Sequence, residues 1–350
     1  MTKITASSGY KGEPSLRRPP SKEFKCREIA CRRSTLDDDD VPMINFECTL
    51  PSGGSLPSKT LTFACRSTSV GVLYEKEETA SKEQKEEVES IVDPFFFESG
   101  YSLAGKTGWQ IWPGTRIAVD CLLFPQPDVD SPRLKFWQQQ LNASTRILEL
   151  GSGVGVVGTQ LAAVTGAQVL ETDLEILVEN STRLNLLHNS ELLNQETDDV
   201  DTVSPPAWLK SAEPIRMGPQ GWVGSAALDW TKPVADQLSE DQCQVDVIIA
   251  CDCVWMKPML QGVMSTLEQL FELRNSSGAE SKPTLLISFQ RRDPAESNKA
   301  SSEIFTTVDE VLGAIHQRKW SVECLAWTPV HYQDKYSDKE DEVFLFEVTP

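Results

Sequence analysis

Residues 147–158 combine a short apolar run with four closely spaced glycines. Three apolar residues, Ile147, Leu148 and Leu150, predict a buried strand, and the glycines at positions 151, 153, 155 and 158 predict a tight turn after it. Val157, Leu161 and Val164 then recur at helical spacing. Glycine lets a backbone approach a ligand where a side chain would collide. The stretch therefore predicts a strand, a turn and a helix whose N-terminus faces a ligand.

Two classes of cofactor use such a turn, and the acids around it help to separate them. The spacing Gly153-x-Gly155-x-x-Gly158 fits a dinucleotide fingerprint, with Asp173 near the position of a ribose-binding acid. Glu149, two residues before the first glycine, instead favours S-adenosylmethionine. A carboxylate facing the pocket attracts a sulfonium and an ammonium and repels a diphosphate. We therefore predict S-adenosylmethionine; a glycine turn that only allows helix–strand packing is the alternative without a ligand.

Further chemistry-bearing residues follow the ends of the next predicted strands, where ligands bind in a doubly wound sheet. Asp173 can accept both hydroxyls of a ribose, or it can cap the next helix. Trp230 can cover an adenine face, or it can simply pack. The tryptophans of segment 107–116 suggest a wall over the cofactor, with packing of the N-terminal extension as the alternative.

Asp252 and Trp255 follow the fourth apolar strand, where a methyl acceptor would meet the methyl donor. Methyl transfer from a sulfonium chiefly requires that the nucleophile is aligned and water removed. For a lysine acceptor, Asp252 can hold the ammonium and Trp255 can form a cation–π wall. A helix cap is the alternative for Asp252.

The elements that must position these residues alternate between strand and helix from about Gly108 onward. Such alternation predicts a parallel sheet covered on both faces. Because segment 328–341 is polar and charged, the last two strands should form a hairpin. The predicted fold class is α/β: a Rossmann-like, doubly wound, seven-stranded, mostly parallel sheet with an antiparallel last strand. We expect strands at 146–150, 168–172, a run ending at 228, 245–251, 284–290, 321–327 and 342–348, the clearest helix at 258–273, and a surface insertion at 189–213.

The predicted domain organisation has three parts. Residues 1–40 are expected to be a disordered leader, residues 41–107 a small β-rich extension with a charged connector, and residues 108–350 the cofactor-binding domain. The extension should contain strands at 43–50, 60–66 and 70–75.

Charge and composition limit the partners. The net charge is −19, and residues 1–35 hold nine Lys/Arg against three Glu, which leaves about −25 on the rest. Such a body repels nucleic acid and suits a basic partner, with plain solubility as the alternative. Nine scattered cysteines and three histidines indicate buried thiols and no metal site. No apolar run approaches the roughly 20 residues that a membrane span requires.

The order of these motifs resembles a known family. A Trp-Pro segment, Glu-x-Gly-x-Gly-x-Gly, an acid after the second strand, Leu-Asp-Trp, and Asp-x-x-aromatic after the fourth strand occur along residues 109–348. They resemble the class I, seven-β-strand S-adenosylmethionine-dependent methyltransferases, and within them family sixteen, which contains protein-lysine methyltransferases. Besides Glu149, the resemblance implies cofactor contacts at Trp112, Gly151, Ser152, Gly153, Asp173, Trp230 and Cys251.

We therefore predict a protein-lysine N-methyltransferase in which Asp252 and Trp255 are the catalytic residues. Lysine-directed members of the family usually carry tyrosine where this chain has Trp255, and indole offers a donor but no acceptor. A small-molecule N-methyltransferase and a cofactor-binding protein without turnover are the alternatives. We expect a protein partner with an accessible lysine, no nucleic acid, no membrane, and a monomer. The expected location is cytoplasmic, with the nucleus, or an organelle reached through residues 1–35, as alternatives.

Overall fold

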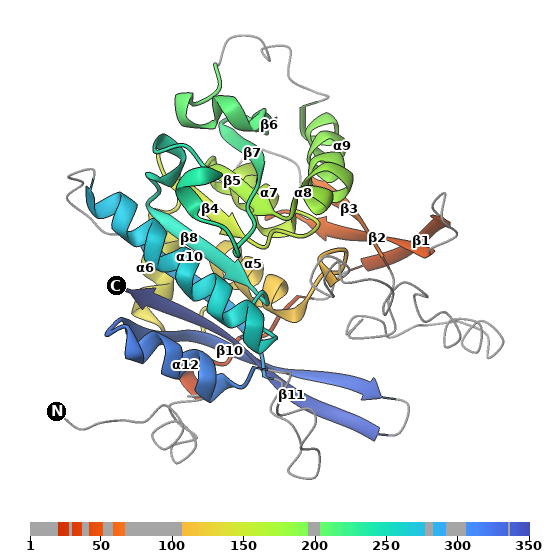
Figure 1. The fold of residues 1–350 in the computed structure, drawn as a ribbon. Coiled ribbons are helices and arrows are strands. Elements are labelled where there is room, and N and C mark those ends of the chain that lie inside the picture. Colours follow the sequence, from red (N-terminus) through yellow and green to blue (C-terminus); the bar gives the residue numbers. More distant parts are fainter. Residues whose placement is uncertain are drawn as a thin grey trace.

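A central sheet organises the chain, for which a computed structural model describes residues 20–27, 30–36, 42–51, 59–66, 107–194, 204–276, 283–291, 306–334 and 337–350. Within these residues eight strands pair in the order β10-β11-β9-β8-β4-β5-β7-β6 (Figure 1). The strands are β4 (Arg146–Leu150), β5 (Gln168–Asp173), β6 (Ile215–Met217), β7 (Gly221–Ala227), β8 (Val247–Cys251), β9 (Thr284–Gln290), β10 (Ser321–Asp334) and β11 (Ser337–Thr349).

The predicted strand directions are confirmed. β4, β5, β7, β8 and β9 run parallel, whereas β11 is antiparallel to both β9 and β10. The predicted number of seven strands is wrong by one, because β6 pairs antiparallel with β7 at the edge. With three residues, β6 is too short to show an alternating pattern in the sequence.

Helices cover both faces of this sheet. On one face α5 (Pro113–Leu123), α7 (Val156–Thr165) and α9 (Arg183–Asn194) bury side chains with Ile147 of β4. On the other, α10 (Lys257–Ser276) and α12 (Val308–Gln317) pack with Leu148, the next residue of the same strand. Neighbouring strand residues point to opposite faces, so the apolar residues of one strand serve two cores. Figure 1 shows α10 crossing in front of β8.

Shorter elements complete the domain. α6 (Pro132–Gln140) follows α5, and α8 (Glu175–Leu177) leads through the π-helical turn η2 (Val178–Thr182) into α9. The 3-10 turns are η1 (Pro20–Lys22), η3 (Ala207–Ala212), η4 (Val234–Asp236) and η5 (Asp241–Cys243). No helix in the described part of the chain is long and apolar enough to cross a membrane.

The predicted insertion at 189–213 is only partly external. α9 continues to Asn194, and in η3 Trp208 and Leu209 are buried against the sheet. The polar and proline-rich composition of this stretch conceals these two apolar anchors. Residues 195–203 lie outside the described residues.

Before Thr107, the described residues form an antiparallel sheet in the order β1-β2-β3. Its strands are β1 (Ala30–Leu36), β2 (Pro42–Thr49) and β3 (Thr60–Arg66), so the strands expected at 43–50 and 60–66 are confirmed. The strand expected at 70–75 lies outside the described residues. β1 and η1 have regular structure inside the leader that was expected to be disordered; the domain boundaries themselves stay predictions.

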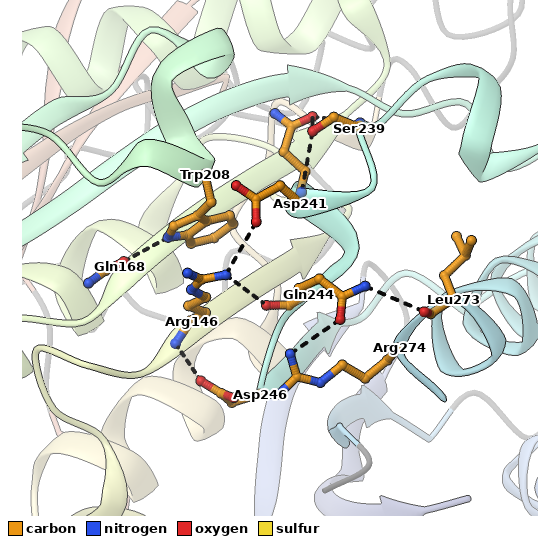
Figure 2. A network of polar contacts seen from close by, with 10 residues as sticks. Arg146, Gln168, Trp208, Ser239, Asp241, Gln244, Asp246, Leu273 and Arg274 are labelled. Carbon is orange, nitrogen blue, oxygen red and sulfur yellow. Dashed lines mark hydrogen bonds and ion pairs between the residues drawn. The ribbon is translucent and has the colours of Figure 1, made fainter. Parts of the chain in front are cut away.

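A polar network closes the amino-end edge of the sheet (Figure 2). Asp246 accepts the backbone N–H of Arg146 at 2.9 Å and the guanidinium of Arg274 at 3.2 Å. Trp208 donates its indole N–H to Gln168 at 2.7 Å, and the Arg146 guanidinium lies over its ring. These bonds occupy the polar groups at the start of β4 and β5. We therefore expect a ligand site at the opposite side of the sheet, at the carboxyl ends of the strands.

Candidate active site

A cavity of about 470 Å³ opens at the carboxyl ends of β4, β5 and β8, within the usual size range of a small-ligand site. Nine of the ten predicted site residues line it, and Glu149 does not. The nine are Trp112, Gly151, Ser152, Gly153, Asp173, Trp230, Cys251, Asp252 and Trp255.

The glycine turn shapes one side of the cavity. Gly153 has a φ of +55°, a left-handed conformation that favours glycine. A Cβ at this position would lie 2.6 Å from the carbonyl oxygen of Gly108. Glycine is therefore required twice here, for the conformation and for the close approach of the Gly108 segment.

Asp173 holds this turn in place. Its Oδ2 accepts the N–H of Gly153 at 2.8 Å, and its Oδ1 accepts the N–H of Leu174 at 2.7 Å. Burial raises the pKa of Asp173 to about 6, although the two amide donors favour the charged form. The N-cap of α8 is Leu174, without a side-chain cap, so the helix-cap alternative for Asp173 does not apply.

Glu149 lies beneath the turn, contrary to the prediction that its carboxylate faces the cofactor. Its Oε2 accepts the N–H of Gly158 at 2.8 Å, and the side chain is buried. Burial raises the pKa of Glu149 to about 8, so the carboxyl is mostly neutral at physiological pH. Residue 149 lies within a strand covered on both faces, so its side chain is buried and does not line the cavity.

Glu171, which the sequence reading missed, lies beside Glu149. It accepts a hydrogen bond from the Thr159 hydroxyl at 3.3 Å, and burial together with the Glu149 carboxyl raises its pKa well above the ordinary range. A Cβ on Gly158 would lie 2.5 Å from Glu171 Oε1 and 2.9 Å from Glu149 Oε2. The fourth glycine thus makes room for two carboxyl groups. A glutamate inside the apolar strand 168–173 was the available signal.

Asp252 ties three segments together. Its two carboxylate oxygens accept the backbone N–H groups of Gly114, at the start of α5, and of Gln290, at the end of β9. Its own N–H donates to the carbonyl of Ser288 at 2.8 Å, and its φ of +51° is unusual for a residue other than glycine. α10 begins only at Lys257, so Asp252 does not cap it. Asp252 therefore lines the cavity and also holds the start of α5 and the end of β9 in place around it.

Two tryptophans form an aromatic wall. The rings of Trp112 and Trp255 stack with their centroids 6.3 Å apart and their planes at 22°. Trp112 immediately precedes α5 and donates its indole N–H to the carbonyl of Thr107 at 3.1 Å. The contact joins segment 107–116 to the residues after β8. The sequence indicated each of these two regions as part of the site but did not show that they touch.

Two buried polar atoms on the cavity wall have no protein partner within the described residues. They are the hydroxyl of Ser152 and the indole N–H of Trp230. A buried donor without a partner costs about 1–3 kcal/mol, so a ligand that pairs with these groups would be favoured. Burial raises the pKa of the Cys251 thiol well above its usual range, which leaves it neutral and unreactive.

Two sequence comparisons relate the chain to lysine methyltransferases. The sequence model of a family described as lysine methyltransferase matches residues 101–208 and 210–311. The protein-lysine N-methyltransferase rrg1 of Schizosaccharomyces pombe is 41% identical over 81 residues, which are 22% of this chain and 26% of that protein. The matched stretch thus spans about a quarter of the length of this curated relative.

Solved structures of methyltransferases show a weaker similarity, with low sequence identity. One from Methanosarcina mazei has 13% identity and a TM-score of 0.35, over 61% of this chain and 96% of that chain. One from Aquifex aeolicus has 12% identity and a TM-score of 0.32, over 67% of this chain and 93% of that chain. At these TM-scores the likeness supports no inference about activity.

Proposed function

The chain belongs to the lysine methyltransferase family, and we propose that it is an S-adenosylmethionine-dependent protein-lysine N-methyltransferase. The observation that supports this most directly is the cavity between the glycine turn and the stacked tryptophans. It offers a place for the cofactor and an aromatic wall suited to a lysine side chain, whose ammonium must first lose a proton so that the neutral amine can accept the methyl group.

The residues around the turn fit S-adenosylmethionine. When bound, this cofactor supplies a methyl group on a positively charged sulfur. Ser152 and Trp230 line the cavity and each carries a buried polar atom without a partner in the described residues, and each oxygen of Asp173 keeps a further acceptor position beside its backbone bond. These residues would hold the adenosine part, and the Cys251 backbone lies on the same wall.

Aromatic side chains form the part of the cavity where we place the methyl acceptor. Trp255 and Trp112 would hold the alkyl chain and the amine of a lysine, since a tryptophan face attracts cations. Asp252 adds a carboxyl group on the cavity wall. Because both its oxygens already accept backbone N–H groups, we assign it first a positioning role, in which it holds α5 against β9.

A transfer assay with labelled cofactor tests the proposal. The protein is incubated with methyl-labelled S-adenosylmethionine and a cell lysate, alongside Asp173→Ala as the inactive variant and Asp236→Ala, an exposed residue of η4, as the matched control. We expect labelled methyl-lysine in protein with the wild type and Asp236→Ala only. Label confined to small molecules would replace the proposal with a small-molecule N-methyltransferase.

Two further outcomes would overturn more of it. Cofactor binding without transfer to any acceptor would point to a binding protein without turnover. Binding of NAD and not of S-adenosylmethionine would refute the cofactor assignment itself. A protein substrate is a proposal that the chain's net charge of −19 supports, since lysine-rich surfaces are basic. The monomeric state and the cytoplasmic location stay predictions.

A further inference from the structure

β3 is the outer strand of the N-terminal sheet, and two asparagines of α9 cover its edge. Asn189 accepts the N–H of Thr62 at 2.8 Å and donates to the carbonyl of Thr62 at 2.9 Å. Asn185 does the same for Ala64, at 2.8 and 3.1 Å. Each side-chain amide thus offers the edge a donor and an acceptor, as a neighbouring strand would. Figure 1 shows α9 beside β3.

Asn185 makes one contact that Asn189 does not. Its Nδ2 also donates to the carbonyl of Val154 at 3.0 Å, in the turn that lines the cavity. Both hydrogens of this buried amide are therefore used, one on the N-terminal sheet and one on the cofactor turn. The corresponding second bond of Asn189 goes to the Asn185 carbonyl within α9.

We propose that Asn185 is a positioning residue that couples docking of the N-terminal sheet to binding of the cofactor. The inference rests on the proposed function, because it takes S-adenosylmethionine as the ligand of the turn. If β3 moves away, the Asn185 amide loses both its bonds to Ala64 and is free to rotate, so Val154 loses a fixed partner. An ordered turn holds the amide for β3 in return. Coupling between sites is reciprocal. The factor by which bound cofactor raises the docking equilibrium of the sheet therefore equals the factor by which docking of the sheet lowers the Kd of the cofactor.

Three substitutions separate this role from a merely structural one. Asn185→Ala removes the bonds to both the sheet and the turn. Asn189→Ala removes an equivalent pair of bonds to β3 and leaves the turn untouched. Thr182→Val removes the hydroxyl that donates to the carbonyl of Gly153 at 2.7 Å, and leaves the sheet untouched.

The readouts are the Kd for S-adenosylmethionine by calorimetry and hydrogen exchange of the Thr62 and Ala64 amides with and without cofactor. In the wild type we expect the cofactor to slow exchange at both amides about tenfold, within the usual range of coupling between sites. Asn185→Ala should weaken cofactor binding about tenfold and abolish this protection. Asn189→Ala should speed exchange but, because β3 stays docked most of the time, change the Kd less than twofold, and Thr182→Val should weaken binding while bound cofactor still slows exchange at both amides.

The outcomes distinguish this inference from the function it rests on. If the wild type does not bind S-adenosylmethionine, the proposed function fails. If it binds, and Asn185→Ala has the same Kd and the same protection of β3 as Asn189→Ala, the coupling is refuted and Asn185 serves only to hold the sheet. Each variant is first checked for a thermal unfolding transition. Binding and exchange are then measured only on folded protein, so that unfolding is not mistaken for weaker binding or faster exchange.

Discussion

Raising the pH through the neutral range should destabilise the folded protein through the buried Glu149 and Glu171 carboxyls. The native state keeps a proton on Glu149 up to a pKa of about 8, whereas the ordinary value is 4.5. Between these values the native state binds more protons than the unfolded chain, so the free energy of unfolding falls as pH rises. The pKa of Glu171 is also raised well above the ordinary range, so it acts in the same direction.

The magnitude follows from linkage. Each pH unit in this window lowers stability by about 1.4 kcal/mol per group, so an increase from about pH 6.5 to about pH 8 removes about 2 kcal/mol through Glu149 alone. At about 2–4 °C per kcal/mol, the melting temperature should fall by about 4–8 °C. Asp173, with a pKa of about 6, is mostly ionised before this window begins.

The assay compares melting at the two pH values for the wild type and a double variant, Glu149→Gln with Glu171→Gln. Glutamine keeps the shape and an acceptor for the Gly158 N–H but cannot titrate, so the double variant should lose much less stability as pH rises. Glu179→Gln, at an exposed position on η2, is the matched control and should behave as the wild type does. An equal pH dependence in the double variant and the wild type, or a wild type that gains stability, would refute the reasoning.

Three other predictions concern the cavity and its frame. Asp173→Ala should abolish measurable binding of S-adenosylmethionine in calorimetry, because it removes both the acceptor of the Gly153 N–H and the acceptor positions left for the adenosine; unchanged affinity would show that the cofactor depends on neither. Trp255→Ala should lower kcat/KM for the protein acceptor about 2- to 30-fold, the range of a cation–π contact, whereas Trp255→Phe keeps an aromatic face and should stay near the wild type. Equal loss in both would argue against the aromatic wall. Asp246→Ala should lower the free energy of unfolding by about 1–3 kcal/mol by leaving the Arg146 N–H without its acceptor, with the cofactor Kd unchanged; a changed Kd would show that the two ends of the sheet are coupled.

The strands and the residues at their ends could be predicted because the signals are local. β4 and β9 begin and end where the apolar runs do, and Asp173, Asp252 and Trp230 reach the cavity because parallel strands end at one edge. Because both faces of this sheet are covered, its central strands are mostly apolar, and β8 is apolar throughout.

What could not be predicted depends on contacts distant in the chain. Asp252 was read as a ligand for an ammonium, yet its bond to Gly114 joins residues 138 positions apart. Nothing in the pattern around residue 252 shows that a helix start lies against it. The same holds for Asn185, whose partner Ala64 belongs to another sheet.

Glu149 shows how a correct prediction can rest on the wrong contact. We expected its carboxylate to face the cofactor, but the side chain is buried and accepts the N–H of Gly158. The acid before the glycines therefore stabilises the turn by accepting a backbone N–H. It does not mark the charge of the ligand.

Charge recognition in this cavity must then come from groups that remain available to a ligand. Both acids on its wall, Asp173 and Asp252, are anchored through both oxygens by backbone N–H groups, so neither can move to pair closely with a cation. The unpaired groups of Ser152 and Trp230 are neutral. A sulfonium or an ammonium would instead meet aromatic faces in Trp112 and Trp255, with the anchored carboxyl groups acting through the field around them. This arrangement favours a positive charge without binding it tightly at one atom, which suits a reaction in which the charge leaves the cofactor as the methyl group moves.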